Sequence, residues 1–281
     1  MAEALQRSAP EEGVFRLLVP STNISPEAES IDVAGQRWQI VDYGAVPSPD
    51  KAPEYTCVSY SWAGGRTPNP FDPERPMSSR AQPALETAIA TLRSPAIWLD
   101  AACMPSQEPA RRVCLQNMGA IYAAASNVLA VLSPSTSFVL ETLRRGQSVD
   151  SQQLRLLEAD DWVSRAWTYQ EIVNSKIINF VAEGQTGNCI SGFKLLNAIG
   201  DTIAQCRRAE QVDAYEFRKT HPHLDALETL AADWLESEYA QRSAYRIMTA
   251  MVDRTTVYPD DYFYAMVGRS PRLNRSRTML S

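Results

Sequence analysis

The residues best suited to chemistry lie between Asp161 and Val173, in the segment DWVSRAWTYQEIV. We expect this segment to form one amphipathic helix. Trp167 and Glu171 are four residues apart, so a helix places them on the same face, where an indole ring and a carboxylate can contact one ligand. An aromatic face attracts a cation, and a carboxylate opposes positive charge on a sugar. The pair therefore suits a cationic aromatic ring attached to a sugar.

The same residues also have ordinary structural interpretations. Glu171 would then be an exposed helix residue paired with a neighbour such as Arg165. Tryptophans are more often core residues than ligand platforms, and we assign Trp162 to the core.

Short apolar runs that alternate with helical patterns predict the framework around this segment. The expected strands are Tyr55–Tyr60, Ala96–Asp100, Asn127–Ser133 and Lys176–Val181, and the expected helices are Ala81–Leu92, Arg111–Ala125 and Asp161–Asn174. Strands that are apolar on both faces indicate a parallel sheet covered on two sides, which is a doubly wound α/β fold. Ligands bind such sheets at the carboxyl ends of the strands. Here those ends carry Ser59, Tyr60 and Trp62, then Asp100, then Ser133.

The flanking segments have different patterns. Val14–Val19 and Gln36–Val41 read as an N-terminal β-hairpin. From Ser191 the sequence is helical, with one apolar face that includes Phe193 and Leu196, and Pro259–Val267 forms the last helix. We therefore expect a disordered N-terminus over 1–12, an α/β domain over 13–185, a helical extension over 186–270 and a disordered tail over 271–281.

Composition limits the classes of partner. The chain has 281 residues, 44% of them hydrophobic, and a net charge of -6, so we expect neither nucleic acid nor a membrane surface as a partner. No apolar stretch approaches the roughly 20 residues that span a bilayer, and the first residues lack a signal-peptide pattern. We expect a cytoplasmic protein. Its five cysteines are odd in number and include no CxxC pair, which argues against disulfides and a zinc site.

Three further features have several interpretations. Asp100 would order the loop after its strand, bond ligand hydroxyls or cap the helix near Arg111. The loop from Tyr60 and Trp62 through Gly64 suits close approach of the backbone to a phosphate. Cys103 invites a thiol-nucleophile interpretation, which we reject because the only histidines, His221 and His223, are far away in sequence.

Five segments together resemble the fungal heterokaryon-incompatibility (HET) domain. They are YTCVSYSWAGG at 55–65, IWLDAACM at 97–104, QNMGAIYAAASNVLAVL at 116–132, WVSRAWTYQE at 162–171 and RTTVYPDDYFYAMVG at 254–268. In the last of these, Arg254 with Asp260 or Asp261 reads as a structural ion pair. The resemblance implies a role in programmed cell death after non-self recognition.

HET domains are in turn similar to TIR domains, which implies a TIR-like (flavodoxin-like) sheet. VSYS resembles the first TIR strand, and AWTYQEIV resembles the helix that carries the glutamate of NAD-cleaving TIR enzymes. Ser61 stands where TIR domains often have an arginine. On this resemblance NAD+ is a substrate and not a cofactor, no metal is needed, Glu171 is the catalytic carboxylate, and Trp167 is the adjacent aromatic residue. The expected substrate-binding set also includes Ser59, Tyr60, Trp62, Gly64, Asp100 and Arg165.

The resemblance leaves the activity open. The first expectation is hydrolysis of NAD+ to nicotinamide and ADP-ribose, in a chain that forms homo-oligomers or pairs with another HET or TIR-type domain. One alternative is a non-enzymatic signalling module that acts through self-assembly. Another is a degenerate relative that binds a nucleotide without cleaving it.

Overall fold

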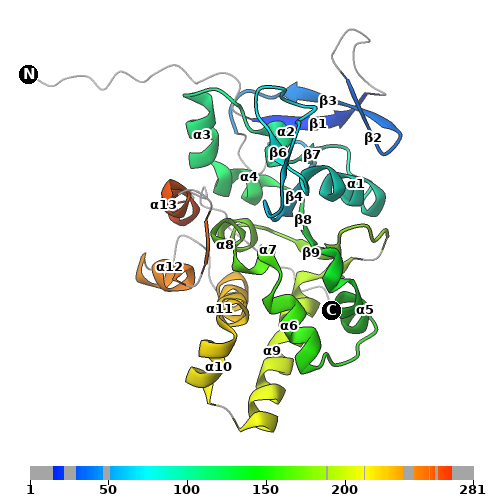
Figure 1. Cartoon of the computed structure of the whole chain (residues 1–281). Coiled ribbons are helices and arrows are strands. Elements are labelled where there is room, and N and C mark those ends of the chain that lie inside the picture. Colours follow the sequence, from blue (N-terminus) through cyan, green and yellow to red (C-terminus); the bar gives the residue numbers. More distant parts are fainter. Residues whose placement is uncertain are drawn as a thin grey trace, which may run out of the picture.

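The computed structural model describes residues 15–21, 30–46, 51–187, 189–211, 213–236, 244–252, 254–256 and 259–267. The expected disordered ends, 1–12 and 271–281, lie outside these ranges. The architecture is mixed α/β, with a central sheet and helices packed around it (Figure 1).

The central sheet has eight strands in the order β10-β9-β8-β4-β7-β1-β3-β2. In chain order these strands are β1 (Arg16–Pro20), β2 (Ile31–Val33), β3 (Gln36–Asp42), β4 (Thr56–Tyr60), β7 (Ile97–Trp98), β8 (Asn127–Leu132), β9 (Ile178–Ala182) and β10 (Ile190–Ser191). Two further strands, β5 (Arg66–Thr67) and β6 (Met77–Ser78), pair separately.

The middle of the sheet is parallel, because β4 pairs in parallel with β7 and β8, and β8 pairs in parallel with β9. Every residue of β4 is buried, as expected for a strand covered on both faces. Among these parallel strands β4 comes first in the chain, and it lies between the second (β7) and the third (β8), which is how the flavodoxin-like strand order begins. The switch point of the sheet therefore lies between β4 and β8.

The helices between these strands are α1 (Ala81–Thr91), α2 (Asp100–Cys103), α3 (Ala110–Gln116), α4 (Met118–Ala124), η2 (Pro134–Thr136), α5 (Ser137–Arg144), α6 (Ser151–Glu158), α7 (Asp161–Ser164) and α8 (Ala166–Val173). The chain crosses the sheet in one direction from β4 to β7 and in the other from β7 to β8. Since such crossovers are right-handed, α1 covers one face while α4 and α8 cover the other. In agreement with this, α4 packs directly on α8.

The predicted N-terminal hairpin is present as β1 and β3, which pair antiparallel. It also joins the main sheet, because β1 pairs antiparallel with β7. Besides β5 and β6, the sequence analysis missed two short strands of the central sheet: β2 lies on the outer side of β3, and β10 pairs antiparallel with β9 within the segment that we expected to be helical.

The prediction of one helix from Asp161 to Val173 is wrong. Arg165 is extended, with φ -75° and ψ 142°, and it separates α7 from α8. Thr255 explains the break: it forms a parallel β-bridge with Arg165, and its backbone exchanges hydrogen bonds of 2.7 and 2.9 Å with Ser164 and Ala166. Trp167 and Glu171 remain four residues apart within α8. The expected helix over 111–125 is likewise divided, at Asn117, into α3 and α4.

The C-terminal part is helical, with α9 (Gly192–Glu210), α10 (Ala214–Thr220), α11 (Pro222–Glu236), α12 (Ala244–Met251) and α13 (Pro259–Val267). Leu196 lies on the buried face of α9 as expected, but Phe193 is 58% exposed, so its place on that face was wrong. A Cβ at Gly192 would lie 2.4 Å from the Ile178 side chain, so glycine permits the close approach of α9 to β9. Among the described helices, none has the length and apolar character needed to span a membrane.

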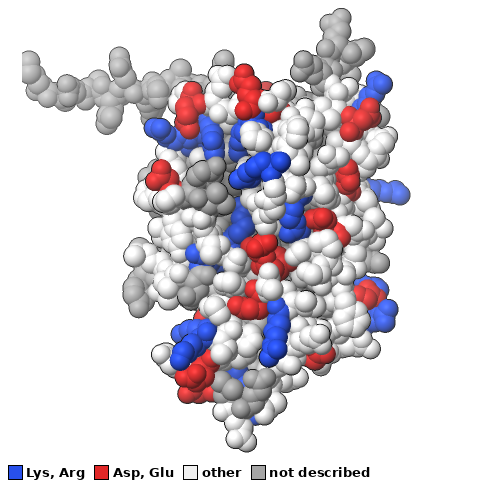
Figure 2. All heavy atoms as spheres, viewed as in Figure 1, with Lys and Arg blue, Asp and Glu red and all other residues white. Residues whose placement is uncertain are grey.

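Basic and acidic side chains intermingle on the face of the molecule shown in Figure 2. No single sign of charge dominates the described residues of that face, and the whole chain carries a net charge of -6. A broad positive surface of the kind that binds nucleic acid is therefore not seen in this view.

Candidate functional site

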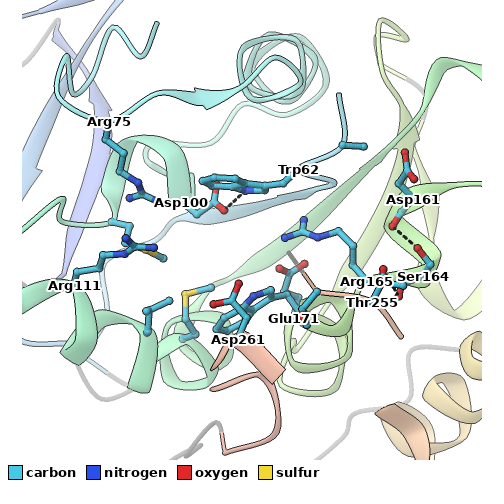
Figure 3. A pocket seen from close by; sticks show the side chains of 16 residues that line it. Trp62, Arg75, Asp100, Arg111, Asp161, Ser164, Arg165, Glu171, Thr255 and Asp261 are labelled. Carbon is cyan, nitrogen blue, oxygen red and sulfur yellow. Dashed lines mark hydrogen bonds between the residues drawn. The ribbon is translucent and has the colours of Figure 1, made fainter. Parts of the chain in front are cut away.

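A cavity of about 210 Å³ opens beside the carboxyl end of β4. Its walls come from the loop after β4, the start of α2, the helices α3 and α4, the α7–α8 break and the C-terminal segment (Figure 3). It is lined by Trp62, Ala63, Arg75, Asp100, Met104, Arg111, Leu115, Met118, Asp161, Ser164, Arg165, Trp167, Glu171, Thr255, Thr256 and Asp261. Seven of these side chains are ionisable, which is a high share for a cavity of this size.

Glu171 is the buried carboxylate of this cavity, with 5% of its surface exposed. Its Oε2 accepts a short hydrogen bond from the Ser59 hydroxyl. Burial raises the pKa of Glu171 to about 7, against the opposing effects of the Arg165 charge and of hydrogen bonds from Ser59 and Tyr122. Both the ionised and the protonated carboxyl group are therefore accessible near neutral pH, which is a range useful for catalysis.

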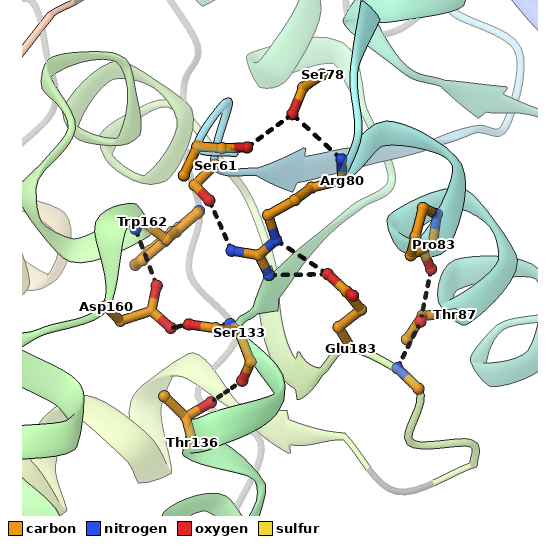
Figure 4. Close-up of polar contacts among 12 residues, drawn as sticks. Ser61, Ser78, Arg80, Pro83, Thr87, Ser133, Thr136, Asp160, Trp162 and Glu183 are labelled. Atoms are coloured by element: carbon orange, nitrogen blue, oxygen red, sulfur yellow. Dashed lines mark hydrogen bonds and ion pairs between the residues drawn. The ribbon is translucent and has the colours of Figure 1, made fainter. Parts of the chain in front are cut away.

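A chain of polar contacts fixes the position of Ser59. Its hydroxyl accepts a hydrogen bond of 2.7 Å from Trp162 Nε1, and the backbone of Trp162 is held in turn by the Asp160 carboxylate at 2.9 Å. The other oxygen of Asp160 accepts from the backbone nitrogen of Ser133 at 2.8 Å, at the end of β8 (Figure 4). The ends of the two central strands are thereby tied to α7. Trp162 is 1% exposed, as expected for a core residue.

Asp100 is held by donors from the end of β4. Tyr60 donates its hydroxyl to Oδ1 at 2.8 Å, and Trp62 donates its indole NH to Oδ2 at 2.6 Å. The backbone nitrogen of Ala101 also donates to Oδ1, at 2.7 Å. Of the three roles considered for Asp100, capping the helix near Arg111 is therefore wrong, because the carboxylate orders the loop after β4 and the start of α2.

Trp167 forms part of the cavity wall and is 7% exposed. Its indole NH donates a hydrogen bond to the Asp261 carboxylate on α13, whose pKa is raised by burial and lowered by this bond. The C-terminal helices therefore contribute directly to the cavity, although we predicted only a structural role for this part of the sequence.

Arg165 points its guanidinium group toward Glu171 (Figure 3). The group also donates a short hydrogen bond to the Tyr60 carbonyl, so it links α8 to the end of β4. The extended backbone at Arg165 makes this direction possible. A continuous helix would have turned the side chain differently, because helical side chains project from the helix axis at fixed intervals.

Arg254 holds the α7–α8 break from behind. Its guanidinium donates to the carbonyl oxygens of Arg165 at 3.0 Å and Ala226 at 3.1 Å, and to the Thr168 hydroxyl at 2.8 Å. Burial lowers its pKa to about 10. The predicted ion pair with Asp260 or Asp261 is wrong: within the described residues Arg254 is bound by carbonyl and hydroxyl oxygens, and Asp261 lines the cavity instead.

The expected site residues fall into three groups. Trp62, Asp100, Arg165, Trp167 and Glu171 line the cavity. Ser59 and Tyr60 do not line the cavity, but each donates a hydrogen bond to a residue that does: Ser59 to Glu171, and Tyr60 to Asp100. Gly64 does not line the cavity; its φ is +85° and its Cα faces the Ser79 hydroxyl, so it serves the backbone turn.

The sequence analysis missed other lining residues. Arg75 lies in the loop between β5 and β6, and Arg111 lies on α3, and neither belongs to a recognisable motif. Asp261 had a visible signal, since it lies in the late segment that resembles the HET pattern, but we assigned that segment to structure.

Cys103 does not take part in the site. It is fully buried, and burial raises the pKa of its thiol to about 12. A thiolate nucleophile is therefore disfavoured, as expected from the sequence. Among the described residues no group of three or more His, Cys, Asp or Glu side chains is arranged to hold a metal ion.

Comparison with known proteins gives one family. Residues 55–171 match the family model of the heterokaryon incompatibility protein (HET), which is less than half of the 281-residue chain. This finding supports the resemblance to a HET domain over those residues. No curated protein and no solved structure matches the chain.

Proposed function

We propose that this protein is a cell-death effector of the HET type that hydrolyses NAD+ to nicotinamide and ADP-ribose. The family match over residues 55–171 supports a function in heterokaryon incompatibility. The single observation that carries the enzymatic part is the buried carboxylate of Glu171 in a cavity shared with Trp167 and Asp100. An exposed Glu171 pointing into solvent would have removed the basis for this activity.

The proposed reaction needs little more than a placed carboxylate. The glycosidic bond breaks with its electron pair moving to the pyridinium nitrogen, so nicotinamide leaves as a neutral molecule without a general acid. The ribose carbon becomes oxocarbenium-like, and the Glu171 carboxylate opposes this charge in a site that excludes most water. A water molecule then adds to that carbon and releases its proton, which the Glu171 carboxylate accepts.

The neighbouring residues have distinct proposed roles. Trp167 packs against the pyridinium ring and contributes about 0.5 to 2 kcal/mol by cation-π attraction. That contribution fades once the ring is neutral, so Trp167 favours binding more than rate. Arg165 and Ser59 keep part of the Glu171 population ionised, since both lower its pKa.

The TIR-like character of the fold is part of the same proposal. It is supported by the central parallel order, in which β4 lies between β7 and β8, and by the location of Glu171 on the helix that precedes β9. Ligands bind such sheets near the switch point, which here lies between β4 and β8.

The test is release of nicotinamide from NAD+ by purified protein, measured by chromatography at high protein concentration and with crowding agents. We expect Glu171→Gln to abolish release, because the amide is uncharged and nearly isosteric. Glu54→Gln, at an exposed glutamate outside the cavity, is the matched control and should retain activity. If the native chain releases no nicotinamide, or Glu171→Gln releases it at the native rate, the hydrolase proposal is abandoned.

The size of the cavity favours one alternative. Its volume of about 210 Å³ is below the roughly 300 to 1,000 Å³ of most ligand pockets. The chain would then signal through self-assembly. A cell-death assay separates the two functions, since a scaffold tolerates Glu171→Gln and a hydrolase does not. Activity that rises more steeply than protein concentration would indicate a site completed by assembly.

A further inference from the structure

Two arginines occupy one end of the cavity. Arg75 comes from the loop between β5 and β6 and Arg111 from α3, and Figure 3 shows both guanidinium groups on the side of the cavity away from Glu171. Burial lowers the pKa of Arg75, and the nearby Arg111 charge lowers it further. Two partly buried like charges repel each other, so their proximity is unfavourable unless an anion lies between them.

The protein itself supplies these groups with few acceptors. Arg75 Nη1 and Arg111 Nε are buried and have no hydrogen-bond partner, and within the described residues neither side chain forms an ion pair. Unpaired buried donors are costly and usually mark a missing partner. Arg80 differs in its ion pair: its Nη2 is also buried without a hydrogen bond, but it lies 2.9 Å from the Glu183 carboxylate, and its Nη1 donates to Ser61 at 2.7 Å (Figure 4).

The nearby carboxylates do not replace an external anion. Asp100 lies within electrostatic range of Arg75, but its oxygens already accept from Tyr60, Trp62 and the backbone of Ala101. Asp72 is also within range of Arg75, and Asp261 is within range of Arg111 while it accepts from Trp167. These acids offset part of the positive charge without filling the donor positions of either guanidinium.

The position of Arg75 is preset for binding. Its guanidinium carbon lies 5.6 Å from the centre of the Trp62 ring, whereas the exposed Arg66 lies 4.8 Å from the same ring. Trp62 is itself fixed by its hydrogen bond to Asp100. An arginine that is already oriented loses little conformational freedom on binding, and its planar fork matches the oxygens of a phosphate.

We propose that Arg75 and Arg111 form a phosphate subsite of the cavity, so that the smallest ligand is a nucleoside carrying a 5′-phosphate. The phosphate lies between the two guanidinium groups and the glycosidic carbon lies at Glu171. This inference rests on the proposed function for the part of the ligand that lies at Glu171. The phosphate part rests on the two arginines alone. Such a ligand is half of a dinucleotide.

The experiment compares ligands that differ only in the phosphate. Calorimetry with the full chain carrying Glu171→Gln, which prevents turnover, measures binding of nicotinamide mononucleotide and of nicotinamide riboside. We expect the mononucleotide to bind at least tenfold more tightly. Arg75→Ala and Arg111→Ala should each remove most of this difference, and Arg66→Ala is the matched control that should retain it. Equal affinity for the two ligands overturns the proposal.

A second measurement uses the native chain, so it does not depend on whether the variants fold. Inorganic pyrophosphate is titrated into the native chain, and the midpoint of thermal unfolding is followed. We expect the midpoint to rise and pyrophosphate to compete with the mononucleotide. No shift and no competition overturn the subsite. If the protein releases nicotinamide but binds both ligands equally, only this inference is refuted. If it prefers the phosphorylated ligand but releases no nicotinamide, only the hydrolase proposal is refuted.

Discussion

Glu171→Gln should make the protein more stable at alkaline pH. Burial raises the pKa of Glu171 to about 7 from its ordinary value of 4.5, so the folded protein holds this proton more tightly than the unfolded chain does. Between these two values the unfolded chain loses its proton first. The free energy of unfolding therefore falls as the pH rises through this window, and it levels off above about pH 7.

The size of this change in stability follows from the difference between the two pKa values. With a pKa of about 7 in the folded protein, burial of Glu171 lowers the free energy of unfolding by about 3 kcal/mol at pH 8. At pH 5 the same burial lowers it by less than about 1 kcal/mol. Glutamine has no such titration. The stability gained by Glu171→Gln should therefore be about 2 to 3 kcal/mol larger at pH 8 than at pH 5.

Urea denaturation followed by circular dichroism at the two pH values measures this difference. Subtracting the gain at pH 5 from the gain at pH 8 cancels the effect of lost or gained hydrogen bonds that does not depend on ionisation. Glu54→Gln serves as the exposed control and should change stability equally at both pH values. If the gain from Glu171→Gln is the same at pH 5 and pH 8, the carboxylate is not desolvated, and the reasoning about its charge in the cavity fails.

Four further predictions concern the site and the contacts that support it. Nicotinamide release should rise with pH through about 7, because only ionised Glu171 opposes the developing charge. Ser59→Ala removes a donor to that carboxylate and should move the midpoint of the rate profile to higher pH; an unchanged midpoint would contradict the role of this hydroxyl. Trp167→Leu should raise KM by about 2- to 30-fold with little change in kcat, measured by steady-state kinetics, whereas a loss confined to kcat would argue against ring packing. Arg254→Met removes the guanidinium group that donates to four backbone carbonyls, and it should lower the free energy of unfolding by about 2 to 4 kcal/mol in urea. A loss below about 0.5 kcal/mol would show that these bonds are replaced by water.

Local patterns predicted the central sheet well because burial on both faces leaves a strong signal. The runs that became β4, β8 and β9 are mostly apolar, and each strand lies within a residue or two of its expected limits. The pairing of Trp167 with Glu171 was also accessible from sequence, because helical spacing alone brings them to one face.

Long-range contacts set the features that the sequence did not predict. The break at Arg165 depends on Thr255, which lies 90 residues further along the chain, and nothing in DWVSRAWTYQEIV itself interrupts a helix. Arg75 and Arg111 lie in a loop and on a short helix, where an arginine is ordinarily a solvated surface residue. Only the fold brings them to one cavity.

The contribution of Thr255 and Asp261 to the cavity bears on how fragments of this protein should be prepared. A fragment that stops at residue 171, where the family match ends, keeps the proposed catalytic carboxylate but loses Thr255, Asp261 and the Arg254 bonds to the carbonyl of Arg165. Without them one side of the cavity lies open to water and the strand-like break beside Glu171 has no pairing partner. Expression of the minimal matched segment is therefore expected to give a protein without the binding site, and a negative assay on such a fragment would be uninformative about the whole chain.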